Sequence, residues 1–187
     1  MMKRVVTMLL IALFFSLNMF SMEVAGVKFP DSITAGKTRL DLNGVGTRTK
    51  FFMKMYISAL YLSRPNSSPE KIIEDDEPMA IRLQITSSLI SSERMEDAVR
   101  EGFINSTGED AGAISDEIEK FISVFKEKIS DNDVYELVYM PGNGVEVFKN
   151  SVSKTVIKGL EFKKALFGIW LGDKPAQKSL KEEMLGR

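Results

Sequence analysis

The strongest constraint on the fold is the order in which two hydrophobic periodicities follow one another along the 187-residue sequence. Strand-like segments come first, two amphipathic helical segments follow, then three short strand-like segments, and finally two more helices. Residues 79–86 (MAIRLQIT) show the strand periodicity most clearly, because apolar and polar side chains alternate without a break. This order predicts an α+β fold in which an antiparallel sheet is covered by helices on one face.

The expected elements follow from the same patterns. The predicted strands are residues 24–29, 38–46, 51–62, 79–86, 134–140, 145–148 and 152–158. Gly44 and Gly46 are expected to form a bend after the second of these strands, since glycine permits a close approach of the backbone. The predicted helices are a short one at 69–74, two that carry apolar stripes over 95–103 and 114–129, one over 162–170 that ends at Gly172, and one from Pro175 to about Leu185.

The first 22 residues have the pattern of a secretory signal peptide. Lys3 and Arg4 form a basic head, and residues 5–15 are apolar except for Thr7. The run is shorter than the roughly 20 residues that a transmembrane helix needs, although a retained N-terminal anchor is the alternative. We therefore expect cleavage between residues 21 and 25, a single domain over residues 23–187, and a periplasmic or secreted protein. Contact with a membrane is expected only through an uncleaved leader.

The composition excludes several classes of chemistry. The chain has no cysteine and no histidine, so disulfides, Ser-His-Asp or Cys-His catalysis and His-ligated metal sites cannot form. Its formal net charge of −1 gives no basic field that would attract nucleic acid or anionic lipid. The acidic run at residues 74–77 does not have the spacing of a calcium loop, and residues 141–144 (PGNG) are a hairpin turn rather than a phosphate loop. No metal and no cofactor is expected, and no residue stands out as catalytic.

Arg48 is the candidate functional residue that the sequence itself singles out. It lies between the two glycines and an apolar, strand-like run. In an unbroken strand Phe52, Lys54, Tyr56 and Ser58 would share one face. An arginine beside a phenol, at the edge of an apolar cleft, suits recognition of a carboxylate. An ordinary surface or turn arginine is the competing interpretation, and the residues alone leave both open.

Four segments, in this order, give the chain a family resemblance. They are VAGVKFPDSI, LNGVGTRTKFFMKMYISALYL, VYMPGNGVEV and GLEFKKALFGIWLGDKPAQKSLKEEMLG. Together they resemble the chalcone isomerase-like proteins over residues 24–186, with the closing helices closest to the bacterial branch. The resemblance implies an open-faced β-sandwich: a large antiparallel sheet under a layer of helices, with a cleft between them. Plant members cyclise a chalcone to a flavanone without a cofactor, and related non-catalytic members hold a fatty-acid carboxylate with an arginine and a tyrosine.

The resemblance also implies roles for individual residues. Arg48 matches the key arginine and Lys54 a lysine of the family, while Tyr56 stands where the plant enzymes have a catalytic threonine. Ser91 and Ala98 are nearest to the positions of a tyrosine and an asparagine in the enzymes, and Ile169-Trp170 replaces a Thr-Met pair. The expected ligand-binding residues are Arg48, Phe52, Lys54, Tyr56, Ile169 and Trp170.

These replacements favour binding over catalysis. We expect a non-catalytic binder of a fatty acid or another amphipathic anion, because most polar groups that would assist the arginine in catalysis are missing. The first alternative is a cofactor-independent intramolecular isomerase, a lyase of the chalcone isomerase type, acting on a chalcone-like enone. The second is a structural or partner-binding protein whose cleft is closed by Trp170.

Overall fold

The computed structural model describes residues 21–108 and 111–187. Most of the predicted signal peptide lies outside this part of the chain, so the leader and its cleavage site stay predictions. The first described element is a strand, β1 (Ser21–Val24), which pairs with β2 (Val27–Pro30) as a separate two-stranded sheet. Within the described residues, no helix is long and apolar enough to cross a membrane.

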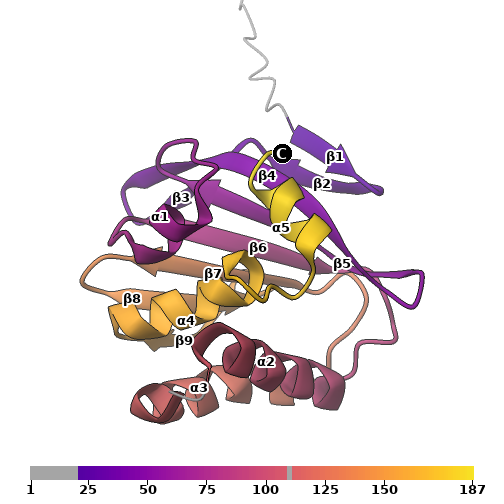
Figure 1. Ribbon diagram of the computed structural model, residues 1–187. Coiled ribbons are helices and arrows are strands. Elements are labelled where there is room, and N and C mark those ends of the chain that lie inside the picture. The colour runs from indigo at the N-terminus through magenta and orange to yellow at the C-terminus, as the bar shows by residue number, and fades with distance from the viewer. Residues whose placement is uncertain (1–20, 109–110) are drawn as a thin grey trace, which may run out of the picture.

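The centre of the molecule is a seven-stranded antiparallel sheet whose strands lie side by side in chain order (Figure 1). Such a meander needs only short connections between neighbours, except where helices are inserted. The strands are β3 (Ser32–Ala35), β4 (Thr38–Lys50), β5 (Met53–Leu62), β6 (Met79–Ile85), β7 (Val134–Met140), β8 (Gly144–Lys149) and β9 (Val152–Ile157).

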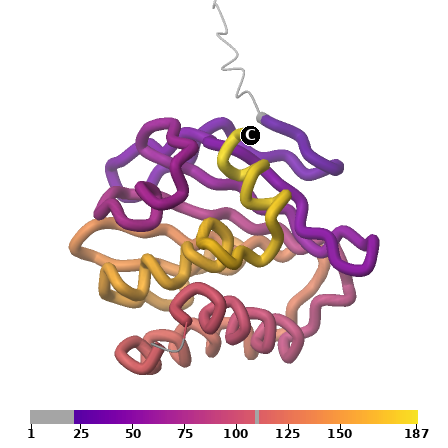
Figure 2. The backbone as a smooth tube through the Cα atoms, viewed as in Figure 1, coloured from indigo at the N-terminus to yellow at the C-terminus, as the bar shows by residue number. Residues whose placement is uncertain are grey.

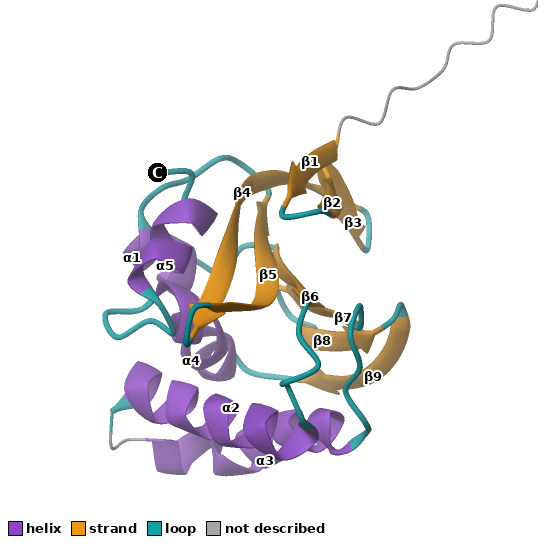
Figure 3. Cartoon of the chain, turned by 90° about the vertical axis from the view of Figure 1, so that its right-hand side faces the viewer, coloured by secondary structure: helices purple, strands orange, loops and turns teal. Residues whose placement is uncertain are grey.

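The helices cover one face of this curled sheet (Figure 3). They bury a large apolar core against it, with Phe103, Phe121 and Phe162 in mutual ring contact at its centre. The helices are α1 (Pro69–Glu74), α2 (Ser92–Thr107), α3 (Ser115–Ile122), α4 (Leu160–Leu171) and α5 (Lys178–Met184), with 3₁₀ turns at Ala111–Ile114 and Ser123–Lys126. The predicted α+β fold, with an antiparallel sheet and helices on one face, is confirmed.

A smaller apolar core lies on the opposite face of the sheet. Val27 and Phe29 of β2 pack there against Ile57, Ala59 and other buried side chains of the sheet. The sequence pattern had predicted one strand over residues 24–29. The structure instead has a tight β1–β2 hairpin, because Ala25 and Gly26 both adopt positive φ and reverse the chain.

The predicted bend at Gly44 and Gly46 is wrong. Both glycines lie inside β4, and their role is to let α5 pack directly on the strand, as Figure 2 shows for the yellow C-terminal segment. A Cβ on Gly44 would collide with backbone oxygens of α5, and one on Gly46 would lie 2.7 Å from Oε2 of Glu183. The glycines are therefore required by a helix–strand contact rather than by a turn.

The chain reverses instead at Phe51 and Phe52, which form the turn between β4 and β5. Both residues have positive φ, of 51° and 62°, in a conformation that usually selects asparagine or glycine. The strand predicted to begin at residue 51 therefore begins at Met53. The turn carries two phenylalanines to the end of a long hairpin that extends beyond the rest of the sheet (Figure 2).

Lys163 of α4 is completely buried although it carries a charge. Its Nζ donates hydrogen bonds of 2.7–2.8 Å to the carbonyl oxygens of Ile72, Ile73 and Asp75 at the end of α1. The last carbonyls of a helix have no partner within the helix, so this ammonium serves as a cap supplied by another element. Burial lowers the pKa of Lys163 to about 8, with the nearby carboxylates opposing the shift.

Candidate functional site

A hollow of about 570 Å³ lies between the β4–β5 hairpin and α2. Its size falls within the range of about 300–1,000 Å³ that is usual for small-molecule sites. Most of the lining is apolar, and three methionines contribute to it: Met53, Met55 and Met95. Methionine side chains are flexible and polarisable, so a wall built from them adapts to a chain-like apolar ligand.

Arg48 contributes a positive charge to the lining of this hollow. Its Nη1 donates to the backbone oxygen of Thr49 (2.8 Å) and to Oε1 of Gln177 (3.0 Å). Both partners are neutral, and none of the ion pairs among the described residues involves Arg48. The Nε and Nη2 edge of the guanidinium takes no part in these two hydrogen bonds, although the guanidinium lies close enough to the hydroxyl of Tyr56 to lower the pKa of that phenol. That edge has the fork geometry that binds a carboxylate through two hydrogen bonds.

Gln177 fixes the position of Arg48 from the far end of the chain. Its Oε1 also accepts from the backbone N–H of Thr49 (2.9 Å), while its Nε2 donates to the oxygen of Thr47 (3.2 Å). Since the oxygen faces two donors and the nitrogen faces a carbonyl, these partners set the orientation of the amide. No local sequence pattern indicates a role for Gln177, which lies immediately before α5 and 129 positions after Arg48.

Tyr56 is the direct cross-strand partner of Arg48 in the register of β4 and β5. Side chains in such a pair are close neighbours on one face of a sheet. The hydroxyl oxygen of Tyr56 accepts a hydrogen bond from Nε1 of Trp170 (3.1 Å). Burial raises the pKa of Tyr56, and the hydrogen bond from Trp170 and the charge of Arg48 only partly offset this. Tyr56 is therefore a neutral phenol near pH 7, and its O–H can donate to a ligand.

The alternation expected for β5 does not hold at its first residues. Arg48 pairs with Tyr56 and Thr49 pairs with Lys54, so Met55 is an extra residue in a β-bulge. A bulge shifts the period-2 alternation by one residue. Met53 and Met55 consequently line the hollow, whereas Lys54 is exposed and lines neither this hollow nor its neighbour.

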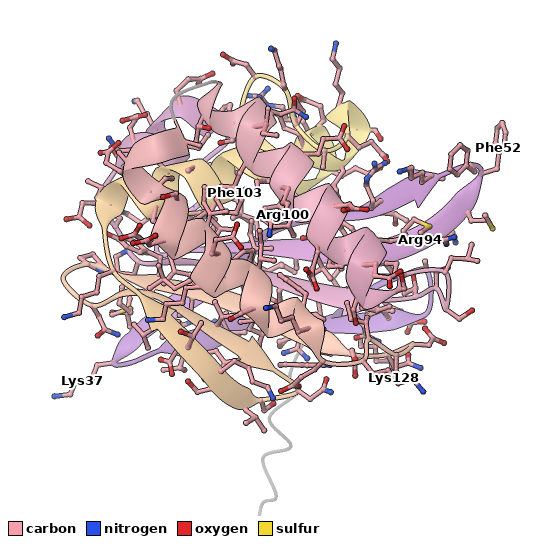
Figure 4. The ribbon with its side chains drawn as sticks, turned by 90° about the horizontal axis from the view of Figure 1, so that it is seen from below. Lys37, Phe52, Arg94, Arg100, Phe103 and Lys128 are labelled. Carbon is pink, nitrogen blue, oxygen red and sulfur yellow. The ribbon has the colours of Figure 1, made fainter. Side chains whose placement is uncertain are left out.

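Phe52 does not form the expected aromatic wall either. Its side chain is fully exposed at the tip of the hairpin and points away from the body of the protein (Figure 4). The reason is the turn at residues 51 and 52, which an alternating strand pattern does not anticipate. Of the expected binding residues, the structure thus brings Arg48 and Tyr56 together and leaves Phe52 and Lys54 outside.

Ile169 and Trp170 line a second hollow, of about 230 Å³, that continues from the first. Arg48, Tyr56 and Met95 line both hollows. Trp170 is only 6% exposed, and its ring forms one wall while its N–H orients the hydroxyl of Tyr56. The larger hollow stays open beside it, so Trp170 does not close the cleft.

Residues beyond the six expected ligand-binding residues also line the hollows. On α2 they include Ala98 in both hollows, and Asn105 in the smaller one, where its amide is an additional polar group. Ser91, the other position compared with the enzymes, caps α2 by accepting from the backbone N–H of Arg94 (3.3 Å). Charged and apolar side chains also contribute to the lining, among them Lys50, Leu89, Arg94, Asp97, Glu101 and Lys174.

The acidic side chains offer no metal site among the described residues, where no group of three or more potential ligands comes together. The expectation that the site works without a metal or cofactor therefore stays a prediction.

Comparison with known proteins assigns the chain to a family. A family model described as chalcone isomerase-like matches residues 21–186, which is nearly all of the described structure. The protein belongs to the chalcone isomerase-like family. No curated protein sequence matches it significantly.

The fold is similar to that of a solved structure. The crystal structure of a fatty-acid binding protein from Arabidopsis thaliana is similar with a TM-score of 0.71. The two chains are 21% identical, and the similarity covers 89% of this chain and 96% of the plant chain. At this level of identity the similarity establishes the shared fold, a large curled antiparallel sheet with helices on one face.

Proposed function

We propose that this chalcone isomerase-like protein binds a fatty acid or a related amphipathic carboxylate, and that it does not catalyse a reaction on it. The observation that carries the proposal is the open, mostly apolar hollow with Arg48 in its lining. An alkyl chain would lie against the methionines, and the carboxylate would meet the guanidinium. The fatty-acid binding protein that shares the fold supports this proposal.

The polar groups around Arg48 suit a carboxylate in particular. The Nε and Nη2 edge of Arg48 offers two N–H groups side by side, and Tyr56 adds an O–H on the same face of the sheet. Trp170 occupies a lone pair of the phenol oxygen, which leaves the proton of Tyr56 available to the ligand. Each charge-assisted hydrogen bond contributes about 1.5–3 kcal/mol when water is largely excluded.

The isomerase alternative has less support from the geometry. A phenol whose pKa is raised is a weak acid, and the α2 position compared with a catalytic asparagine holds only the methyl group of Ala98. The closed-cleft alternative is disfavoured because the hollow beside Trp170 is open. Turnover of chalcones by the purified protein, lost in Arg48→Met, would revive the first alternative.

Ligand extraction and a binding titration test the proposal. We expect acyl chains to be detected by mass spectrometry of the purified protein, and a fluorescent fatty acid to bind it. Arg48→Met keeps the apolar stem and should weaken binding by about 10- to 100-fold, the equivalent of one charge-assisted interaction. Arg39→Met is the matched control, because Arg39 is an exposed arginine elsewhere on β4. Absence of acyl chains together with equal binding by both variants would overturn the proposal.

We also propose that the protein is exported. The support is the basic head and the apolar run of residues 3–15, together with a domain that begins near residue 21. N-terminal sequencing of protein recovered from its native compartment should give a first residue between 21 and 25. Recovery of the intact leader in a membrane fraction would instead identify a retained anchor.

A further inference from the structure

The tip of the β4–β5 hairpin exposes more apolar surface than a turn normally does. Phe51 is 78% exposed, Phe52 is fully exposed and Met53 is 44% exposed. Three consecutive large apolar side chains thus face solvent at the point of the hairpin that lies furthest from the core, as Figure 4 shows for Phe52. Clustered exposed apolar residues of this kind mark an interaction site.

The backbone of the tip gives a second, independent indication. Phe51 and Phe52 both have positive φ, where a bulky side chain costs of the order of 1–2 kcal/mol and asparagine or glycine would fit without strain. Neither ring contributes to the buried cores on either side of the sheet. The two phenylalanines therefore cost backbone strain and bury little apolar area in return, which indicates a role outside the folded core.

The charged residues of the hairpin that flank the tip are all positive. Lys50 precedes the two phenylalanines and Lys54 follows them, and no acidic residue occurs between Asp41 and Glu70. Lys50 and Lys54 are one or two residues behind the apex, which is about 3–7 Å along extended strands. Side chains anchored at an interface reach about 5–10 Å into the boundary between headgroups and acyl chains. The phenylalanines at the apex would therefore reach the acyl chains of a bilayer, while Lys50 and Lys54 would lie at the level of the anionic headgroups.

The tip is also continuous with the mouth of the larger hollow. Phe51 and Met53 belong to both, and Leu89 and Arg94 stand on the other side of the same opening. Leu89 is partly exposed there, and Figure 4 shows Arg94 on the same side of the molecule as Phe52. An amphipathic ligand that leaves a bilayer at this tip would enter the hollow without crossing bulk water.

We propose that the tip of the β4–β5 hairpin, residues 50–54, docks on an anionic membrane surface and passes the ligand between the bilayer and the hollow. The passage of ligand rests on the proposed function, whereas the docking itself does not. The net charge of the chain had led us to expect membrane contact only through the leader. The local arrangement of three apolar side chains and two lysines at the tip changes that expectation.

Vesicle sedimentation tests the docking. The probes are vesicles of phosphatidylcholine alone and vesicles of two parts phosphatidylcholine to one part phosphatidylglycerol, with the protein lacking residues 1–20. The double variant Phe51→Asn/Phe52→Gly supplies residues that suit the turn, so it should fold with an unfolding temperature at or above that of the wild type. We expect its partitioning to the anionic vesicles to fall at least about tenfold, because each buried phenylalanine contributes about a tenfold factor.

Two controls separate the tip from the rest of the surface. Ile104→Gln removes an exposed apolar side chain (62% exposed) from the far part of α2 and should leave partitioning unchanged. Lys50→Gln and Lys54→Gln should each weaken binding to the anionic vesicles about fivefold. Lys37→Gln, at the opposite end of the molecule from Phe52 in Figure 4, should have little effect.

The outcomes distinguish this inference from the proposed function. The side chain of Phe52 lines neither hollow, so Phe52→Gly alone separates the two roles. Loss of vesicle binding by this single variant, with unchanged titration of a soluble fluorescent fatty acid, supports docking by the tip. Equal partitioning of the wild type and the double variant overturns it, whatever the fatty-acid titration shows. Sedimentation of a dimer in the absence of lipid, abolished by the double variant, would also overturn it, because the tip would then pack against a second copy.

Discussion

Replacing Lys163 with methionine should destabilise the protein more than its apolar surroundings suggest. The ammonium caps three carbonyl groups at the end of α1, and methionine has a similar volume but no donor. A buried hydrogen-bond acceptor that loses its partner costs about 1–3 kcal/mol. The change removes all three donors at once from a helix of six residues.

The net magnitude follows from how exposed each carbonyl group becomes. The bond to Ile72 is buried, whereas those to Ile73 and Asp75 are partly buried, so water can replace the lysine at two of the three oxygens. Removing the ammonium also removes its own desolvation penalty, which offsets part of the loss. We therefore expect the free energy of unfolding of Lys163→Met to fall by about 2–3 kcal/mol near pH 7.

Urea denaturation of Lys163→Met and Lys164→Met measures this difference. Lys164, the neighbour in sequence, makes surface ion pairs with Glu74 (2.8 Å) and Glu161 (3.3 Å). Such pairs contribute less than about 1 kcal/mol, so Lys164→Met is the matched control. Equal stability of the two variants, or a gain in stability for Lys163→Met, would refute the capping role and show that an apolar residue serves as well at this position.

The pH dependence provides a further check on Lys163. Its pKa in the folded protein is about 8, against an ordinary value of 10.5, so between these values the unfolded chain binds more protons than the folded one. Stability contributed by this group therefore rises with pH in that window. The difference in unfolding free energy between the wild type and Lys163→Met should grow by about 1 kcal/mol per pH unit above pH 8. A constant or shrinking difference would contradict this.

Three further substitutions test other parts of the structure. Gly44→Ala should lower the free energy of unfolding by about 1–3 kcal/mol, because the new methyl group meets the backbone of α5, whereas Gly112→Ala meets nothing within 4 Å and should have little effect. Gln177→Glu places a carboxylate beside Arg48 and should weaken fatty-acid binding about tenfold in the fluorescence titration, with equal affinity arguing against Arg48 as the anion site. Ser58→Ala should be neutral or stabilising by up to about 1 kcal/mol in thermal unfolding, since its buried hydroxyl has no partner among the described residues.

The sequence predicted the architecture because the relevant signals are local. Residues 79–86 alternate without a break, and their strand is found as β6. The order of strands and helices then predicted a sheet covered on one face, and the family resemblance was confirmed by the family model. Apolar and polar residues alternate along such a strand because one of its faces packs against the helices.

The details of the site could not be predicted, for physical reasons that differ between residues. The bulge at Met55 adds one residue without changing the composition of the strand, so the face of Lys54 was assigned wrongly. The turn at Phe51 and Phe52 contains neither of the residues that signal such a turn. Gln177 contacts Arg48 across 129 positions, which no local pattern reports.

The contact between the last helix and β4 has a consequence for biosynthesis. The hairpin that carries Arg48 leaves the ribosome well before Gln177, whose amide holds the guanidinium in place, and before the helix that covers Gly44. A nascent chain that lacks residues 177–187 can therefore form the sheet but not the contacts that position Arg48. Under the proposed function, the ligand would be bound only after synthesis has passed α5, and in a chain exported N-terminus first this binding would follow export.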